Sequence, residues 1–444
     1  MATDRRLTRR ELLAMTGGGL TAAALLGAYP SAAFAAPAAQ GEEITFLIRD
    51  DIKSAYAGEA AAEAWNAAFP TKIKLDIPPA AQDVSQKIQA AQAANELIWD
   101  GFAVIEVPWN TAEWISRGLI QPLDDYIAAS TVPRAAEVVP GIIESIRESM
   151  KVEGKQYAIP GNVGSVALAW LTEPLQLAGI TERPLTWDDV YNAAVKIKET
   201  SPELMPFDSA ITPLSDLWSM IWGASDQPIT AEGLVDITGQ ASIDALLWMR
   251  KMVDEELMPE TLTGPGAATM ENFSNWQKGG TAMITSFDVA GTIAQATFGK
   301  EAAATGLNMR REAANVRAGT PFWVNGCVVL QGAKNPQAMT DFLLWWFGPD
   351  NQETGRQIAE VAAKPCYQYT YDQFVKDNPD LAWEMEAIEI VRNSVPFPST
   401  TTNAIQQRLT YPWVQRVVSG DRMDPMEAMQ NALQEIRDEI AKQL

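Results

Sequence analysis

The stretch 273-FSNWQKGGTAMITSFDVAG-291 carries the signals that decide the fold. Its first part predicts a helix that ends at residues 276–278, because Gly279 can adopt the left-handed conformation that closes a helix at low cost. Residues 281–287 predict a buried strand, since apolar side chains stand there between small hydroxyl residues. The paired glycines leave the backbone little steric restriction at the junction. This stretch therefore predicts a helix followed at once by a buried strand.

The composition narrows the class of protein. A chain of 444 residues is too long for one typical domain, and 47% hydrophobic residues allow two sizeable cores. The formal net charge of −22 disfavours nucleic acid and anionic membranes as partners. The chain has no histidine, which removes His-dependent triads and His-metal sites, and its two cysteines cannot form a zinc cluster. We therefore expect no metal and no cofactor.

The first residues predict an export signal. The segment 8-TRRELL-13 resembles the twin-arginine export motif, and a Gly/Ala-rich run follows over residues 15–28. The tripeptide 33-AFA-35 fits a small-x-small cleavage site. A transmembrane anchor is the alternative, but three glycines and Pro30 interrupt a run that is short for a membrane span. We expect a signal peptide at residues 1–35 and a periplasmic or extracytoplasmic mature protein, exported through the twin-arginine pathway.

The next hundred residues predict a parallel sheet. Strands are expected at 43–49, 72–77 and 101–107, and helical patterns lie between them. In open sheets of this kind, ligands bind beyond the carboxyl ends of the strands. Those ends carry Asp50, Asp51, Glu106 and Trp109, which are candidate ligand-binding residues.

Several motifs in a fixed order resemble one family. They are 114-WISRGLIQPLDDY-126, 154-GKQYAIP-160, 184-PLTWDD-189, 276-WQKGGTAM-283 and 335-NPQAMTDF-342. Together they resemble the family 1 extracellular solute-binding proteins, the maltose-binding-protein-like receptors of ABC importers. The resemblance spans residues 42 to 444. Where relatives often carry a Tyr-Asn pair, this chain has Trp170-Leu171, so a ligand contact cannot be carried over there.

The resemblance implies a periplasmic-binding-protein-like α/β fold. Its two α/β lobes are joined by a multi-crossover hinge, with the ligand cleft between them. We expect residues 41–158 plus 282–333 to form the N-terminal lobe. Residues 159–281 plus 334–444 are expected to form the C-terminal lobe. The family's chain crosses back between the lobes near the stretch 273–291, and a strand at 320–330 returns to the first lobe.

Further candidate ligand-binding residues follow from the resemblance and from the tryptophans. The family's site next to its Ala-Met strand implies Asp288, and the returning strand carries Trp323. Trp218 and Trp222 share one helix face at spacing i, i+4, where core packing is the alternative to ligand stacking. The loop 395-VPFPSTTT-402 is expected to complete the second lobe's side of the cleft.

The expected function is that of a receptor that closes on a small solute and delivers it to the permease subunits of an ABC importer. Carboxylates and indoles suit a carbohydrate, and the resemblance also allows a polyol, a glycerol phosphate or a polyamine. A local Arg49 or Lys53 would favour an anionic ligand. A secreted glycoside hydrolase with two carboxylates is the alternative. No carboxylate pair stands in a recognisable catalytic motif, so we expect a monomeric binding protein and no enzyme.

The two cysteines allow two interpretations, a disulfide or two free thiols. Export would place Cys327 and Cys366 where disulfides form, but Cys327 lies in an apolar strand where a free thiol packs as a small hydrophobe. A twin-arginine substrate folds before export, in a reducing compartment. We therefore predict that neither cysteine is required for function.

Overall fold

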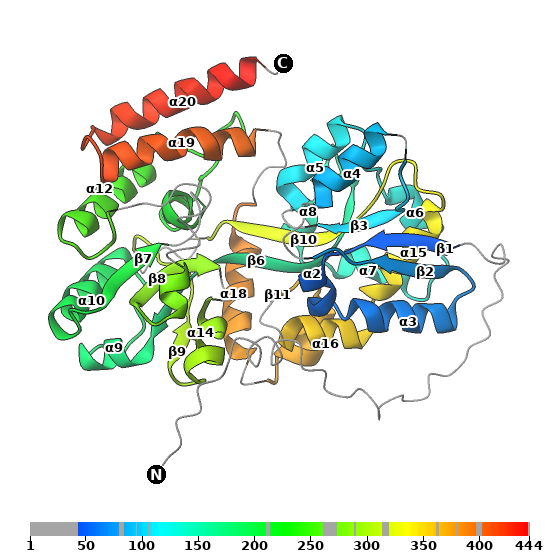
Figure 1. The fold of residues 1–444 in the computed structure, drawn as a ribbon, viewed down its shortest axis with the longest axis horizontal. Helices are drawn as coiled ribbons and strands as arrows, with labels where there is room; N and C mark the ends of the chain where they lie inside the picture. Colours follow the sequence, from blue (N-terminus) through cyan, green and yellow to red (C-terminus); the bar gives the residue numbers. More distant parts are fainter. Residues whose placement is uncertain are drawn as a thin grey trace, which may run out of the picture. The chain divides into compact units, whose positions relative to one another are not determined.

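The structure is a computed structural model. It describes residues 43–442 apart from 80–83, 95, 105–106, 210–213, 261–272, 288–289, 313–318, 361–363, 379–380 and 397–401. The predicted signal peptide, residues 1–35, lies outside the described residues. Residues 41–444 form one compact unit, whose helices and strands are labelled in Figure 1. None of the described helices has both the length and the apolar character that a membrane span requires.

The first lobe is built on parallel strands. β1 (Glu43–Leu47) pairs in parallel with β2 (Lys72–Asp76) on one side and with β3 (Gly101–Val104) on the other. Parallel strands need a long crossover connection, and helices occupy both connections here. β10 (Phe322–Val329) adds to β3 in antiparallel orientation. The predicted parallel pairing of these three strands is confirmed, but β3 ends at Val104 and helix α5 (Val107–Ser116) already begins within the predicted strand 101–107.

One long strand, β6 (Ala158–Leu171), joins the two lobes (Figure 1). Its first half pairs with β10, and its second half pairs with β8 (Thr281–Phe287). β7 (Met205–Ser209) adds to β8 in parallel, so the sheet order is β2-β1-β3-β10-β6-β8-β7. The chain thus enters the second lobe along β6, as the resemblance predicts, and returns to the first lobe along β10. The short strands are β4 (Lys151–Val152), β5 (Lys155–Gln156), β9 (Ala303–Thr305) and β11 (Lys364–Pro365).

The predicted helix and strand of the stretch 273–291 are confirmed. Residues 273–277 are helical, Gly279 has a φ of +77°, and β8 begins at Thr281. Trp276 is buried, and its Nε1 donates a hydrogen bond to the Ala290 carbonyl at 3.1 Å. The left-handed conformation of Gly279 is one that side chains disfavour, which explains the glycine at this position.

Two helix starts also form as the sequence predicts. The side chains of Thr186 and Asp189 make a reciprocal capping box at the start of α10 (Trp187–Thr200). Asp424 caps α20 (Pro425–Ala441) by accepting the N–H of Glu427 at 3.0 Å. In both cases a side chain satisfies a backbone donor that the first helical turn leaves without a partner.

Each lobe has its own main hydrophobic core. We call the core that contains β1–β3 the first core, and the core that contains β7 and β8 the second core. The first lobe holds α2 (Asp50–Ala55), α3 (Gly58–Ala68), α4 (Val84–Ala93), α5 (Val107–Ser116), α6 (Asp124–Ala129), α7 (Ala135–Gly141), α8 (Glu144–Ser149), α15 (Pro336–Trp346), α16 (Gln352–Glu360), α17 (Gln368–Thr370), the π-helical turn η2 (Tyr371–Val375) and α18 (Ala382–Asn393). The second lobe holds α9 (Thr172–Leu177), α10, the π-helical turn η1 (Leu214–Trp218), α11 (Ser219–Trp222), α12 (Gln240–Asp254), α14 (Ala290–Phe298), α19 (Asn403–Val418) and α20.

The lobe boundaries differ from the sequence-based expectation in two segments. Residues 336–391, which we expected in the C-terminal lobe, pack in the first core, where Phe46 meets both Phe342 and Trp346 edge to face. Residues 282–309, which we expected in the N-terminal lobe, belong to the second lobe because β8 pairs with β7 there. The chain therefore crosses back at β10 and not at the stretch 273–291. A third crossing lies between α18 and α19.

Both cysteines are free and buried. At residues 162–163, β6 pairs with β10 on one edge and with β11 on the other. Cys327 of β10 and Cys366, next to β11, therefore lie on opposite sides of β6. Two strand spacings are about 10 Å, which exceeds the Cα separation that a disulfide allows. Burial raises the pKa of both thiols well above its ordinary value, so neither is a reactive thiolate.

We predict that the purified protein contains two thiols and no disulfide. Without reductant, a thiol-specific reagent should label about two groups per chain after unfolding and almost none before it, because both side chains are buried. A double Cys→Ala variant should keep its solute binding. Mass spectrometry that finds a Cys327–Cys366 bridge would contradict this prediction.

Candidate functional site

The candidate residues at the strand ends are described only in part. Asp50 opens α2 just beyond β1, where it is exposed and pairs with Lys53 at 3.1 Å. Lys53 also pairs with Glu59 at 3.2 Å, so two carboxylates offset its charge. Glu106 and Asp288 lie outside the described residues, and the backbones of Asp51 and Trp109 are described without their side chains. Their assignment as ligand-binding residues stays a prediction.

An aromatic pair marks the place where β6, β8 and β10 meet. Trp323 of β10 packs edge to face on Phe287, the last residue of β8, with ring centroids 5.0 Å apart. Trp323 is paired with Gly164 of β6, and a Cβ at Gly164 would lie only 2.3 Å from the indole. Glycine is therefore required beside Trp323. The predicted ligand-binding residue Trp323 thus lies at the lobe junction, but it is 8% exposed.

A second junction feature is a pair of amides on the two crossing strands. Asn162 of β6 faces Asn325 of β10, and the amide of Asn325 donates to the Asn162 side-chain oxygen at 3.3 Å. The hydroxyl of Tyr56 donates to the same oxygen at 2.6 Å. The strand register shifts immediately afterwards, between Asn325 and Gly326. Both asparagines are only half-buried, so polar side chains reach the surface at the crossing.

The two tryptophans of the second lobe have different surroundings. Trp218 is fully buried in the second core. Trp222 is also buried, but its Nε1 donates to the Val395 carbonyl at 2.8 Å and its own carbonyl accepts the N–H of Gly319 at 3.1 Å. Trp222 therefore joins α11 to both segments that cross between the lobes at this point. Ser394 adds to the junction, because its Oγ accepts the N–H of Thr320 at 2.9 Å.

A cavity of about 340 Å³ lies at this junction. We call it the junction cavity. The second lobe contributes its lining from Trp222 to Pro228, and the first lobe contributes the end of α18. Its volume is within the range of sites for small ligands. The residues that line it are Trp222, Ser225, Asp226, Pro228, Gly319, Arg392, Asn393 and Val395.

The charges around the junction cavity favour a ligand that is not anionic. The Arg392 guanidinium is already engaged, because it pairs with Glu389 and donates to the Gln368 side chain. Asp226 is exposed and open to an incoming donor. Carboxylate, amide and hydroxyl groups beside an indole provide both hydrogen-bond partners and an apolar face. Such a lining suits a neutral polyhydroxylated molecule.

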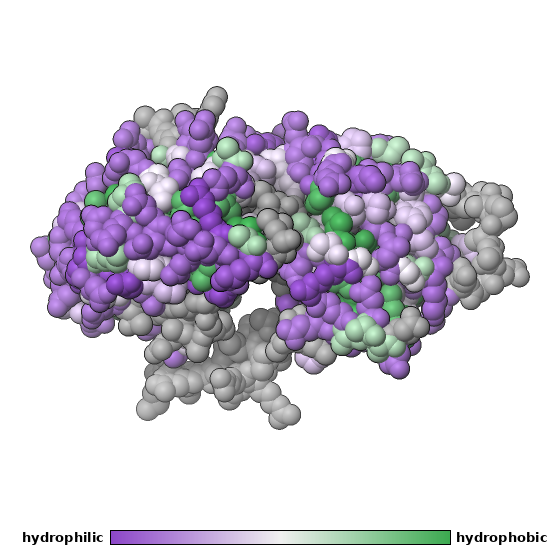
Figure 2. Space-filling view, turned by 90° about the horizontal axis from the view of Figure 1, so that it is seen from above, coloured by the Kyte–Doolittle hydropathy of each residue, from purple (hydrophilic) through white to green (hydrophobic). Residues whose placement is uncertain are grey.

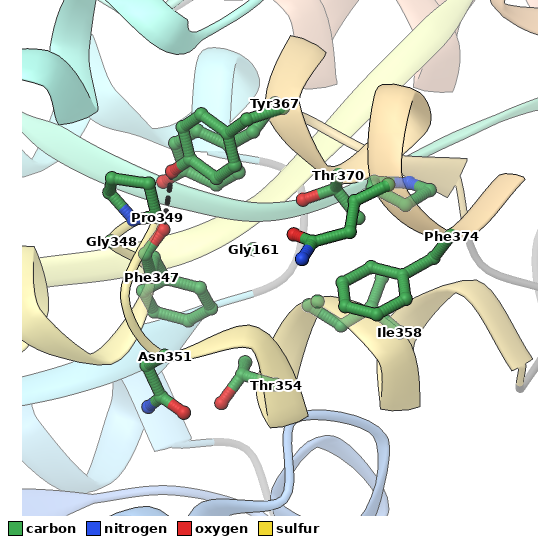
Figure 3. A pocket seen from close by; sticks show the side chains of 14 residues that line it. Gly161, Phe347, Gly348, Pro349, Asn351, Thr354, Ile358, Tyr367, Thr370 and Phe374 are labelled. Carbon is green, nitrogen blue, oxygen red and sulfur yellow. Dashed lines mark hydrogen bonds between the residues drawn. The ribbon is translucent and has the colours of Figure 1, made fainter. Parts of the chain in front are cut away.

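A second hollow, shown in Figure 3, is too small for a solute. Its volume of about 10 Å³ is roughly that of a single water. Aromatic side chains, Phe347, Tyr367 and Phe374 among them, close around it, and the Tyr369 hydroxyl donates to the Phe347 carbonyl at 2.5 Å. This hollow belongs to the packing of the first lobe.

The surface agrees with the acidic composition. The face in Figure 2 is mostly hydrophilic. The exposed large hydrophobic residues of the described chain are spread over several separate elements, including Ile98, Leu177, Leu247 and Phe298. Single exposed apolar residues are ordinary on protein surfaces and mark no site.

Sequence reasoning missed most of the polar residues at the junction. Asp226, Arg392 and Asn393 stand in no motif, although Arg392 and Asn393 come just before the predicted loop 395–402. Asn162 follows the motif 154-GKQYAIP-160 by two residues, so an amide in that crossing strand was a usable signal. Of the loop itself, residues 397–401 lie outside the described residues, while Val395 lines the junction cavity.

Two α/β lobes, three crossings and a cavity between the lobes define the class of two-lobed periplasmic binding proteins. The sequence matches the family described as bacterial extracellular solute-binding protein over residues 50–353. That match covers more than half of the chain, so the protein belongs to this family of binding proteins, which are not enzymes.

Individual relatives agree with this assignment. A curated binding protein of Brucella abortus (strain 2308) is 21% identical over 274 residues, which is 61% of this chain and 60% of the relative's length. The structure of the GacH receptor of Streptomyces glaucescens, solved unliganded and with acarbose, gives a TM-score of 0.71 at 20% identity. The sugar-binding protein MalE of Xanthomonas citri gives 0.73 at 16% identity. Each of these two structures matches 90% of this chain and 98% of its own. At such identities they establish the fold alone.

Proposed function

We propose that this protein is an extracytoplasmic receptor that closes on a small polyhydroxylated solute, a sugar or oligosaccharide, and delivers it to the permease subunits of an ABC importer. The observation that carries the proposal is the family match over residues 50–353 together with a polar cavity lined from both lobes. A ligand that contacts both lobes stabilises the closed arrangement over the open one. To raise the closed fraction of the receptor from about 1% to about 99%, the ligand must bind the closed arrangement about 10⁴-fold more tightly than the open one.

The proposed site is the lobe junction. Trp222, Asp226 and Asn393 would hold the solute at the junction cavity, while Asp50 would contribute from the first lobe and Trp323 from β10 at the lobe junction. Asp51, Glu106, Trp109, Trp218 and Asp288 remain proposed from the sequence. The charge balance at the cavity supports a neutral ligand over a glycerol phosphate. A polyol or a polyamine is the alternative, since Asp226 could also accept an ammonium group.

A thermal-shift screen over sugars, polyols, glycerol phosphates and polyamines tests the receptor function. A true ligand at 100 times its Kd stabilises the folded state by about 2.7 kcal/mol and raises the melting temperature accordingly. We expect a neutral sugar or polyol to give the shift. If no compound of any of these classes changes the melting temperature, the receptor proposal is wrong for them.

Variants then test the site separately from the function. With the solute that the screen identifies, Asp226→Ala should weaken binding by about tenfold, because a hydrogen bond to a charged group is lost. Trp222→Phe should reduce the ligand-induced change in tryptophan fluorescence. Trp413→Phe is the matched control, since Trp413 belongs to the second lobe but does not line the cavity. If Asp226→Ala binds the solute with unchanged affinity, the binding site lies elsewhere. The receptor function itself is not contradicted by that result.

A further inference from the structure

Three buried polar side chains form a chain of hydrogen bonds inside the second lobe. The Thr285 hydroxyl of β8 lies 3.0 Å from the Ser209 hydroxyl, at the end of β7. The Ser209 hydroxyl in turn donates to the carboxyl group of Asp216. Asp216 is 4% exposed, and the two hydroxyl residues are also buried. We call these three residues the buried triad.

The buried triad fastens a turn that leads to the junction cavity. Asp216 lies within η1, where its φ of −92° and ψ of −106° interrupt the helical conformation. Its carbonyl accepts the Ser219 hydroxyl at 2.9 Å, at the start of α11. Trp222 is the last residue of α11 and lines the junction cavity. The Asp216 side chain therefore links this turn to the ends of β7 and β8.

Among the described residues around it, ionised Asp216 would have no cationic partner. Burial raises the pKa of Asp216 to about 8, the hydrogen bond from Ser209 opposes the rise, and the charge of Asp208 adds to it. Asp208 on β7 is the nearby charged group that acts on Asp216. The facing residue of β8 is the neutral Thr285, and α11 carries no charged residue. The charged residues of α12, which packs against η1, have partners elsewhere: Asp244 pairs with Arg311, Arg250 donates to the Val417 carbonyl, Lys251 lies over the Tyr191 ring, and Asp254 pairs with Arg422.

We propose that the buried triad is a proton-sensitive lock, which holds η1 on β7 and β8 while Asp216 carries a proton and releases it when Asp216 ionises. A protonated carboxyl group is neutral and can both donate and accept hydrogen bonds among the buried hydroxyls. The ionised form brings a second negative charge beside Asp208 in a buried site, so the carboxylate gains solvation if the turn opens. Opening shifts α11 and with it Trp222.

The direction of the pH effect follows from proton linkage. The folded state holds the Asp216 proton up to a higher pH than the unfolded chain, whose aspartates lose it near pH 4. The stability contributed by this group is therefore complete below about pH 4, decreases as the pH rises, and is lost once the pH has passed about 8. Between these two pH values, each unit increases the population of the opened turn about tenfold, and the increase levels off above about pH 8.

The test needs no solute, so it is independent of the proposed receptor function. Asp216→Asn mimics the protonated carboxyl group at every pH. The variant should melt at a higher temperature than the wild type at high pH. This difference in melting temperature should increase by about 5 °C between pH 5 and pH 8 and then level off. The matched control is Asp341→Asn in the first lobe, where burial also raises the pKa of the carboxyl group, although Ser130 and Gln337 bind it. Because the control keeps Asp216, exchange in its residues 214–222 should rise with pH as it does in the wild type.

Hydrogen exchange measured by mass spectrometry locates the opening. In the wild type, exchange of residues 214–222, corrected for the intrinsic pH dependence, should increase about tenfold from pH 6 to pH 7. Asp216→Asn should abolish the increase. Equal exchange in the wild type at both pH values overturns the lock, even if the variant does not fold. Once a solute is identified, its affinity for the wild type should fall as the pH rises from 6 to 8, and Asp216→Asn should not show this fall. An unchanged wild-type affinity overturns the coupling to Trp222, which alone rests on the proposed function.

Discussion

Replacing Asp100 by alanine is expected to lower the free energy of unfolding by about 2–4 kcal/mol. Asp100 is buried where β1, β3 and the start of α15 converge. Its Oδ2 accepts the N–H of Thr45 at 2.9 Å, and its Oδ1 accepts the N–H groups of Lys334 at 2.7 Å and Asn335 at 3.3 Å. The variant lacks the carboxylate that accepts hydrogen bonds from these three backbone N–H groups. The groups belong to segments more than 200 residues apart in the chain. The first lobe therefore depends on this carboxylate to join its N-terminal strands to α15.

Urea denaturation followed by circular dichroism measures the loss as a lower midpoint. Glu96→Ala is the matched control, because Glu96 is an exposed carboxylate four residues earlier in the chain. Its replacement should change the stability by no more than about 0.5 kcal/mol. Equal effects of the two substitutions would show that the three hydrogen bonds of Asp100 contribute little.

Trp218→Ala is expected to cost about 3–5 kcal/mol of stability, since it removes a fully buried indole from the second core. The neighbouring side chains cannot fill the space, because Leu217 and Ile221 are already buried among other elements. Trp218 is one of the two tryptophans for which the sequence allows either core packing or ligand stacking. A large loss of stability without solute is the result that core packing requires.

The control is Trp413→Ala, also in the second lobe. Trp413 is only partly buried, and its Nε1 bonds to the exposed Glu435 at 3.1 Å. Truncation there should cost less than half as much, since much of the removed surface already meets water. A Trp218→Ala protein that melts like the wild type but binds solute weakly would favour the stacking role instead.

Local features of the fold were predictable from sequence because local interactions determine them. The start of β8 follows from Gly279 and the apolar residues after it, and the capping box at Thr186 follows from hydroxyl and carboxylate spacing. The parallel pairing of β1, β2 and β3 follows from the alternation of strands and helices. The family follows from motifs in a fixed order along the chain.

The sequence by itself therefore determined the fold class, the helix starts at Thr186 and Asp424, and the absence of histidine chemistry. Only the tertiary structure decided which lobe receives a given segment: α15 to α18 pack in the first core, although they follow the second lobe's strands in the chain. It also placed Trp218 in the core and Trp222 at a cavity, separated the two cysteines by β6, and brought Asp216 to Ser209. The physical reason is that helices, turns and caps depend on neighbours within a few residues. Burial and pairing between distant segments depend on which apolar faces and strand edges remain open once the sheet has formed.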